Sequence, residues 1–347
     1  MRHSDATLTS AGLSASLLAI LLGAISCAPL GRGCSQPTVV CVGLVTGHGS
    51  VKTGIERQAW LALQDSLAAG TVDHIDYIET VDTRDRAANI AYLADSSYDI
   101  LITTGAGIMD AAIPSAEEHP DVLFVAIQPG HDPLRTPKNL VKFEFQEEQG
   151  GFLAGAAAAM ITRTHRVAAV CEARYIDYIE RYCEGFGAGA KFVDNGTQAD
   201  IVYRQGADES LFRDPAWGAA TAAQLVEDGA DVVFAAGETT AEAALIEAAK
   251  RGALVIGAQA DLFEETPDIR ERLVTSAILE VREGLESLIR VSVHRHPGPG
   301  PYPGDMGLAP FHAYEERLAP GVAAELLRIE AALRSGSLNA NVQLETP

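Results

Sequence analysis

The chain has 347 residues, 47% of them hydrophobic, and its 26 lysine and arginine residues against 47 aspartate and glutamate residues give a formal net charge of −21. A chain this apolar is expected to fold, and its length is enough for two compact units of ~150 residues each. So acidic a surface repels phosphate groups, which excludes nucleic acid and anionic lipid headgroups as direct partners.

The N-terminal segment predicts export. An apolar run over residues 13–25 leads to Cys27 and is too short to span a bilayer, and the small residues at its end suit a signal peptidase. We predict a signal peptide over 1–26 and, as in bacterial lipoproteins, acylation of Cys27, with simple cleavage as the alternative. Residues 27–37, rich in Gly, Pro and Ser, are then a linker that tethers the folded part to the membrane.

From residue 38 onward, short apolar runs alternate with helical stretches. Apolar strands that alternate with helices indicate parallel sheets with right-handed crossovers. We therefore predict an α/β fold with two doubly wound parallel-sheet lobes and a ligand cleft between them. The expected strands are Val39–Val45, Ile75–Ile78, Ile100–Thr103, Val122–Ile127, Leu140–Phe145, Val167–Val170, Ile201–Tyr203, Val232–Ala235 and Leu254–Ile256.

The expected lobes each combine two stretches of chain. The N-terminal lobe should contain residues 38–144 and 264–293, and the C-terminal lobe residues 145–263 and 294–347. The Pro-rich run 296–304 is expected to be a surface excursion.

Four cysteines follow the leader: Cys34, Cys41, Cys171 and Cys183. In an oxidising compartment they can form disulfides, but their pairing cannot be read from the sequence. Cys171 ends an expected strand and Cys183 lies in the next helix, so a bridge between them is one option. No metal-ligand spacing occurs, and we expect neither a metal nor a cofactor.

Two loops imitate nucleotide-binding motifs without completing them. After Gly105-Ala106-Gly107, Asp110 stands where a third glycine is needed and would place a carboxylate near the pyrophosphate position. In 47–53 only Lys52-Thr53 matches a P-loop. No Gly-x-Ser-x-Gly elbow is present, so no motif supports catalysis.

Glycine-rich stretches carry a family resemblance. Gly150-Gly151-Phe152-Leu153-Ala154-Gly155 and residues 185–191 are the most specific, and 98–127, 229–234 and 307–311 continue in order. Together they resemble the basic-membrane-protein family of lipoproteins, the PnrA-like purine-nucleoside-binding subunits of ABC importers. The resemblance implies a type I periplasmic-binding-protein fold and an extracytoplasmic protein, held to the membrane by lipid alone, that passes a small ligand to an ABC permease.

The resemblance also implies a ligand site, which departs from the family pattern. The aromatic and amide positions at the start of the first helix are Ile55 and Glu56 here, and Gln259 replaces an aspartate, whereas Phe212 and Asp261 match. A single aromatic face leaves either a nucleoside or a different small polar ligand as the solute. The implied ligand-binding residues are Ile55, Glu56, Arg57, Asp110, Phe212, Asp214, Gln259 and Asp261.

Five of these residues also have a purely structural interpretation. Phe212 could fill a gap beside a helix, and Asp110 could interact with a helix dipole. Glu56 and Arg57 could form a solvated pair, and Asp261 could join the lobes by a hydrogen bond. For the whole chain, a ligand-sensing module for a membrane receptor or, less favoured, a secreted hydrolase remain alternatives to a transport role without bond chemistry.

Overall fold

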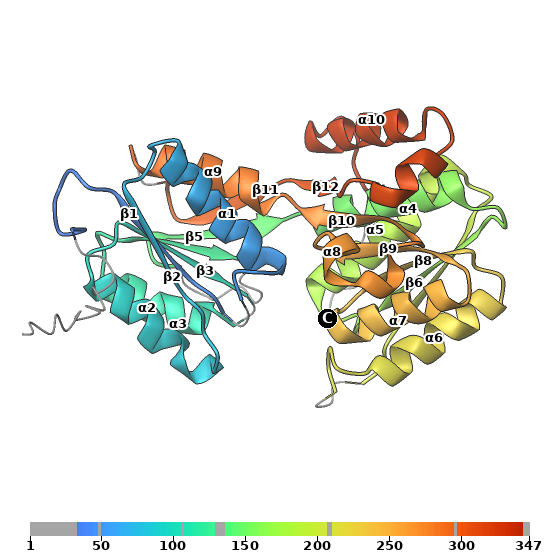
Figure 1. Ribbon diagram of the computed structural model, residues 1–347, viewed down its shortest axis with the longest axis horizontal. Coiled ribbons are helices and arrows are strands. Elements are labelled where there is room, and N and C mark those ends of the chain that lie inside the picture. Colours follow the sequence, from blue (N-terminus) through green and yellow to red (C-terminus); the bar gives the residue numbers. More distant parts are fainter. Residues whose placement is uncertain are drawn as a thin grey trace, which may run out of the picture.

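Two six-stranded sheets, each covered by helices, organise the chain into two lobes side by side (Figure 1). This computed structural model describes residues 33–47, 50–105, 107–128, 136–206, 210–294 and 297–342. The expected signal peptide, Cys27 and most of the linker lie outside the described residues. Within the described part, no helix has the length and apolar character needed to cross a membrane.

The first sheet is parallel throughout, in the order β11-β5-β4-β3-β1-β2. Helices α1 and α9 cover one face, and α2 and α3 cover the other (Figure 1). The strands are β1 (Cys41–Val45), β2 (His74–Ile78), β3 (Ile100–Thr104), β4 (Leu123–Ile127), β5 (Leu140–Phe145) and β11 (Gly300–Gly304). The helices are α1 (Gly54–Ala68), η1 (Thr83–Asp85), α2 (Arg86–Asp95), α3 (Met109–Glu118) and α9 (Val281–Ser292).

The second sheet has the order β12-β10-β9-β8-β6-β7, and only β12 runs antiparallel to its neighbour. Its strands are β6 (Arg166–Cys171), β7 (Gln198–Tyr203), β8 (Val232–Ala236), β9 (Leu254–Gln259), β10 (Leu273–Leu279) and β12 (Met306–Leu308). Its helices are α4 (Glu147–Ile161), α5 (Asp177–Val193), α6 (Pro215–Glu227), α7 (Glu238–Lys250), α8 (Leu262–Glu265), η2 (Pro267–Ile269), η3 (His312–Arg317) and α10 (Val322–Arg334). The predicted α/β fold and all nine expected strands are confirmed.

The chain crosses between the lobes three times, at Gln146, Glu280 and Asp305. This corrects the expected lobe ranges, because β10 pairs with β9 in the second sheet and β11 pairs with β5 in the first. The run 296–304 is therefore not only a surface excursion. Because of Pro301 and Pro303, the sequence pattern did not predict strand β11. These prolines are tolerated because β11 lies at the edge of its sheet.

The glycine-rich stretches pack two helices against each other. A Cβ on Gly155 would lie 1.9 Å from the carbonyl oxygen of Phe186, and a Cβ on Gly189 would lie 1.9 Å from that of Phe152. Helices α4 and α5 therefore touch backbone to backbone, which only glycine allows. These residues build the core of the second lobe.

The cysteine pairing left open by the sequence is Cys34 with Cys41 and Cys171 with Cys183. The second bridge joins the carboxyl end of β6 to the middle of α5. Because Cys171 is the last residue of β6, this bridge fixes the strand immediately before Glu172.

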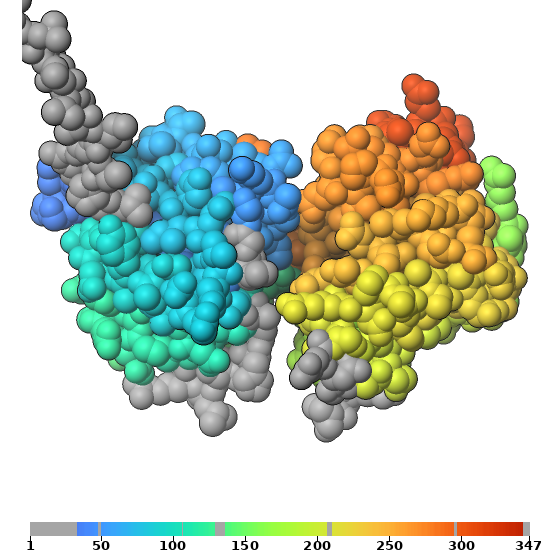
Figure 2. Space-filling view, turned by 60° about the horizontal axis from the view of Figure 1, so that its bottom comes forward, coloured from blue at the N-terminus to red at the C-terminus, as the bar shows by residue number. Residues whose placement is uncertain are grey.

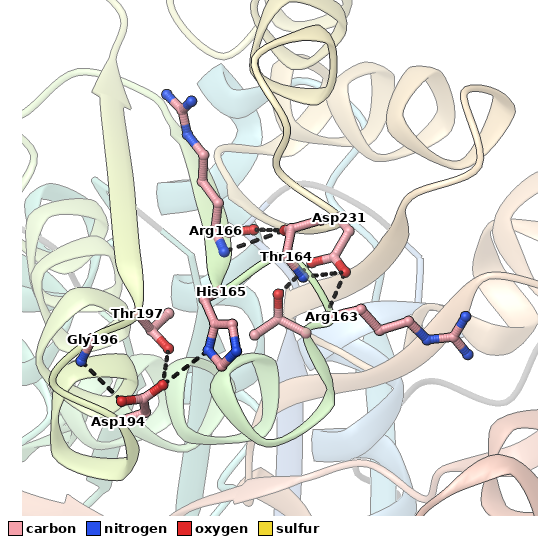
Figure 3. Close-up of polar contacts among 9 residues, drawn as sticks. Arg163, Thr164, His165, Arg166, Asp194, Gly196, Thr197 and Asp231 are labelled. Carbon is pink, nitrogen blue, oxygen red and sulfur yellow. Dashed lines mark hydrogen bonds and ion pairs between the residues drawn. The ribbon is translucent and has the colours of Figure 1, made fainter.

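A polar cluster joins loops at the edge of the second lobe that lies opposite the carboxyl ends of its strands (Figure 3). Asp231 accepts hydrogen bonds from the backbone nitrogens of Arg163 (2.7 Å) and Thr164 (3.3 Å). Asp194 accepts from the backbone nitrogen of Gly196 (2.9 Å), and its other oxygen lies 3.1 Å from His165 Nδ1. These loops precede β6, β7 and β8, so the cluster lies at the amino ends of the strands and has a structural role.

Candidate functional site

The carboxyl ends of both parallel sheets face the lobe boundary. Strand β5 ends at Phe145, where the chain enters the second lobe, and β10 ends at Leu279, where it returns to the first. The parallel strands beside them end at the same edges. Between these edges the space-filling view shows an open hollow that separates the lobes (Figure 2). Open α/β sheets bind ligands at such edges, so this cleft is the candidate site.

On the first-lobe wall, Glu56 lies at the ends of β1 and β3. Its Oε1 accepts a hydrogen bond from Thr104 Oγ1 (3.1 Å), which in turn accepts one from the backbone nitrogen of Gly47 (3.1 Å). Arg86 Nε donates to the carbonyl oxygen of Gly47 at 2.6 Å. The structure thus places the Glu56 carboxylate at the cleft edge with a guanidinium in the same cluster.

The other first-lobe candidates are not gathered around Glu56. Ile55 is half-buried and packs against the apolar core. Arg57 and Asp110 are exposed, and no hydrogen bond between described atoms joins either side chain to Glu56. Asp110 lies in the first turn of α3, where a negative charge interacts favourably with the helix dipole.

On the second-lobe wall, a buried ion pair follows β6 and β7. Arg204, 4% exposed, donates from Nη1 to Glu172 Oε1 (3.3 Å), and Glu172 is fully buried. Arg204 Nε donates to Asp214 Oδ2 at 3.3 Å. Asp214 also caps α6 by accepting from the backbone nitrogen of Trp217 (3.0 Å). The predicted residue Asp214 therefore belongs to a charged network.

Phe212 lies in the same network and presents a half-buried ring. Its backbone nitrogen donates to Glu172 Oε2 at 3.0 Å, and its φ of 63° lies in the left-handed region. The ring is parallel to that of Tyr178 within 6°, with centroids 6.4 Å apart. Burial raises the pKa of the Tyr178 phenol, and the carboxylate of Glu238 raises it further. The second lobe thus offers the aromatic rings of Phe212 and Tyr178 beside the neutral phenol of Tyr178 and the carboxylate of Glu238.

Gln259 and Asp261 follow β9 and differ in their surroundings. Gln259 is half-buried at the strand end with a φ of 73°. Asp261 Oδ1 caps α8 through the backbone nitrogen of Phe263 (3.1 Å), and its Oδ2 lies 2.7 Å from His312 Nε2. Both Asp261 oxygens therefore contact groups of their own lobe.

A hydrogen bond from α1 to α8 joins the two walls. The backbone nitrogen of Gly54, at the start of α1, donates to Glu265 Oε1 at 2.8 Å. The two residues are 211 positions apart and belong to different lobes. Because α1 also carries Glu56, this contact couples the position of the first-lobe wall to α8 of the second lobe.

A buried glutamate occupies the first crossover. Glu147 is 6% exposed at the start of α4, and Gln128 Nε2, from the end of β4, donates to its Oε1 at 3.4 Å. Burial raises its pKa to about 7. Tyr182, near Glu147, is fully buried. Its phenol oxygen has no hydrogen-bond partner among the described atoms.

We expect Glu147→Gln to stabilise the protein at alkaline pH. The folded pKa of about 7 lies above the ordinary value of 4.5, so the stability is complete below about pH 4.5 and declines as the pH rises through 7. Glutamine removes this penalty, which amounts to about 3 kcal/mol from the size of the shift. Urea unfolding at about pH 5 and pH 8 measures it.

The control for this experiment is Glu148→Gln. Glu148 pairs with Arg181 (3.2 Å) and is the next residue in α4. This variant should keep most of the pH dependence of the unmodified chain, because burial is the largest cause of the raised pKa of Glu147 and the charge of Glu148 the smallest. If Glu147→Gln shows the same loss of stability between pH 5 and 8 as the unmodified chain, Glu147 does not carry the penalty.

Sequence reasoning missed four residues of this region: Glu172, Arg204, Tyr178 and Glu147. A signal existed for two of them. Glu172 directly follows β6 and Arg204 directly follows β7, and a charged residue at the carboxyl end of a buried parallel strand points into the inter-lobe edge. In the described ranges, no three His, Cys, Asp or Glu side chains are grouped so that they could hold a metal ion.

Two parallel-sheet lobes, three crossovers and an inter-lobe cleft define a two-lobe α/β fold of the periplasmic-binding-protein type. A solved ABC transporter solute-binding protein from Conexibacter woesei has this fold, with a TM-score of 0.71, 20% identity, and coverage of 88% of this chain and 99% of that one. A transcriptional activator of the comK gene from Bacillus halodurans is similar, with a TM-score of 0.67, 19% identity, and coverage of 86% and 99%. At these identities the likeness concerns the fold alone.

The chain belongs to the family of PnrA-like ABC transporter substrate-binding proteins, whose model matches residues 53–295. It is 27% identical over 237 residues to the CD4+ T-cell-stimulating antigen of Listeria monocytogenes, covering 65% of this chain and 64% of that protein. It is 27% identical over 223 residues to the ABC transporter nucleoside-binding protein BmpA of Lactococcus lactis, covering 62% and 60%. The match therefore spans about three fifths of these relatives.

Proposed function

We propose that this protein captures a small polar ligand of nucleoside type by closing its two lobes and presents it to an ABC permease. The observation that supports this most directly is that each residue hydrogen-bonds to a strand end of its own lobe, Phe212 to Glu172 after β6 and Glu56 to Thr104 at the end of β3. A ligand that contacts both walls binds the closed state better than the open one, so binding shifts the population towards closure.

The chemistry of the two walls favours a ring with hydrogen-bond donors. Stacking of one base on an aromatic side chain contributes ~1–3 kcal/mol, and Phe212 offers such a face. The Glu56 carboxylate is an acceptor for hydroxyl or amine groups at the opposite wall. The relative from Lactococcus lactis is named a nucleoside-binding protein, which is consistent with this ligand class.

A thermal-shift screen of residues 28–347 against nucleosides, nucleobases, amino acids, polyamines and sugars tests the proposal. A ligand at 100 times its Kd adds ~2.7 kcal/mol of stability, so a nucleoside hit is easily detected. A hit confined to sugars or amino acids would overturn the ligand class. Release of free base from a nucleoside would instead support the hydrolase alternative, and loss of signalling without loss of uptake would support the sensor.

We expect Phe212→Ala to weaken nucleoside binding at least ~10-fold, because the stacking surface is lost. Phe192→Ala is the matched control, since Phe192 is 48% exposed at the end of α5, away from the strand ends that face the cleft. Isothermal titration calorimetry with guanosine measures both. Equal dissociation constants for Phe212→Ala and the unmodified chain would remove Phe212 from the site.

We further propose that acyl chains on Cys27 hold the protein at the outer face of the cell membrane. The support is the sequence pattern before Cys27. In cells, Cys27→Ser should move the protein from the membrane fraction to the released fraction, since no lipid can then be attached. Retention of this variant in the membrane fraction would contradict the anchor.

A further inference from the structure

The segment from Ser210 to Asp214 holds Phe212 in a backbone conformation that it would not adopt freely. A φ of 63° on an aromatic residue is strained and persists only where neighbouring groups enforce it. The segment lies between β7 and α6 without regular structure of its own. Its side-chain and backbone contacts therefore decide where the Phe212 ring points.

Two buried charged residues supply these contacts. Glu172 Oε2 accepts from the Phe212 nitrogen at 3.0 Å and thereby holds the middle of the segment. Arg204 holds both ends, because its Nε donates to Asp214 Oδ2 at 3.3 Å and its Nη2 donates to Ser210 Oγ. Arg204 and Glu172 also bind each other, through the 3.3 Å hydrogen bond from Arg204 Nη1 to Glu172 Oε1.

The backbone around the pair makes room for it. A Cβ on Gly237 would lie 2.6 Å from Glu172 Cβ, and Gly237 has a φ of 135°. Only glycine fits where β8 ends against Glu172. Burying two charges carries a desolvation cost, and a matched apolar pair often stabilises a protein at least as well. Stability alone therefore does not account for this ion pair.

We propose that Glu172 and Arg204 are positioning residues for ligand recognition: they fix residues 210–214 so that Phe212 presents its ring to the cleft. This inference rests on the proposed function, in which the ligand stacks on Phe212. It adds a determinant of specificity in which Glu172 and Arg204 act on the ligand through the position of the Phe212 ring. The planar guanidinium, with several donors in fixed directions, bridges three acceptors in a way that lysine cannot.

The test removes both charges together, with the double variant Glu172→Met/Arg204→Met, so that no buried charge is left unpaired. We expect this variant to fold, to bind guanosine at least ~10-fold more weakly, and to exchange the Phe212 amide hydrogen at least ~10-fold faster. Adding Phe212→Ala to it should weaken binding less than 3-fold further, because both changes remove the same stacked ring.

A matched control removes an ion pair at the far edge of the same lobe. Arg166 and Asp200 pair at 2.6 Å where β6 and β7 begin. The double variant Arg166→Met/Asp200→Asn should leave guanosine affinity and Phe212 exchange unchanged. If the methionine double variant fails to fold, Arg204→Lys replaces it, since lysine keeps a positive charge opposite Glu172 but cannot reach Ser210 and Asp214 together. Because Glu172 and its bond to the Phe212 nitrogen remain, exchange should accelerate less than in the double variant, while guanosine affinity should still fall.

The outcomes separate this inference from the proposed function. A Phe212 amide that stays protected without the ion pair, or an effect of Phe212→Ala that is fully additive, overturns the positioning role. A chain that binds no nucleoside overturns the proposed function, while the exchange measurement still decides whether Glu172 and Arg204 fix the segment.

Discussion

Replacing Gly155 by alanine is expected to destabilise the protein by about 3 kcal/mol or more. The new methyl group would lie 1.9 Å from the carbonyl oxygen of Phe186, and backbone atoms on both helices prevent relief by a side-chain rotation. Helices α4 and α5 must then separate along their whole contact. Urea unfolding followed by circular dichroism measures the change.

Gly187→Ala, in the same helix pair, is the control. The nearest atom to its Cβ would be Ile201 Cδ1 at 2.9 Å, the end of a side chain that can turn away. Alanine also gains about 0.5–1 kcal/mol of helix propensity over glycine. We expect a net change within about 1 kcal/mol. Similar losses in both variants would show that the close approach of α4 and α5 is not what these glycines provide.

Removing the Cys171–Cys183 bridge by the double alanine variant should cost about 3 kcal/mol and weaken ligand binding. The bridge closes a loop of 12 residues, for which chain entropy accounts for the loss of stability. Binding suffers because Cys171 is the residue before Glu172, which holds Phe212. Denaturant unfolding and calorimetry with guanosine measure the two effects.

The Cys34–Cys41 bridge gives the comparison. It closes a loop of 7 residues at the start of β1, the amino end of the first sheet and the edge away from the cleft. Its removal should lower stability by about 2 kcal/mol and leave the dissociation constant unchanged. If both double variants weaken binding equally, the effect reflects overall stability and not the position of Glu172.

The glycine signatures show how a family pattern can be informative without marking the site. Gly155 and Gly189 identify the family because two helices of this fold pack backbone to backbone, a requirement that any ligand specificity leaves intact. The cleft walls face no such constraint. The resemblance therefore allows Glu56 and Gln259 to differ from the family pattern while the framework is kept.

Several properties follow from the sequence alone. Apolar runs that alternate with helical stretches specify parallel, buried strands, since no other arrangement covers both faces, and this predicted the α/β fold and nine strands. The family resemblance also named Phe212 and Glu56 as ligand-binding residues, and this stays a prediction. The sheets that strand β10 and the Pro-containing strand β11 join could not be predicted from the sequence. They depend on which sheet has a free edge where the chain crosses back between the lobes.

Tertiary structure alone decided which charges meet. Glu172, Arg204 and Asp214 lie up to 42 positions apart, and they come together only because β6 and β7 are neighbours in register, with Cys171 opposite Tyr203. The bond from Gly54 to Glu265 likewise requires the second lobe to return beside α1. Sequence patterns report the burial and periodicity of local segments, whereas contacts between distant strand ends are fixed by strand order and by the crossovers that join the lobes.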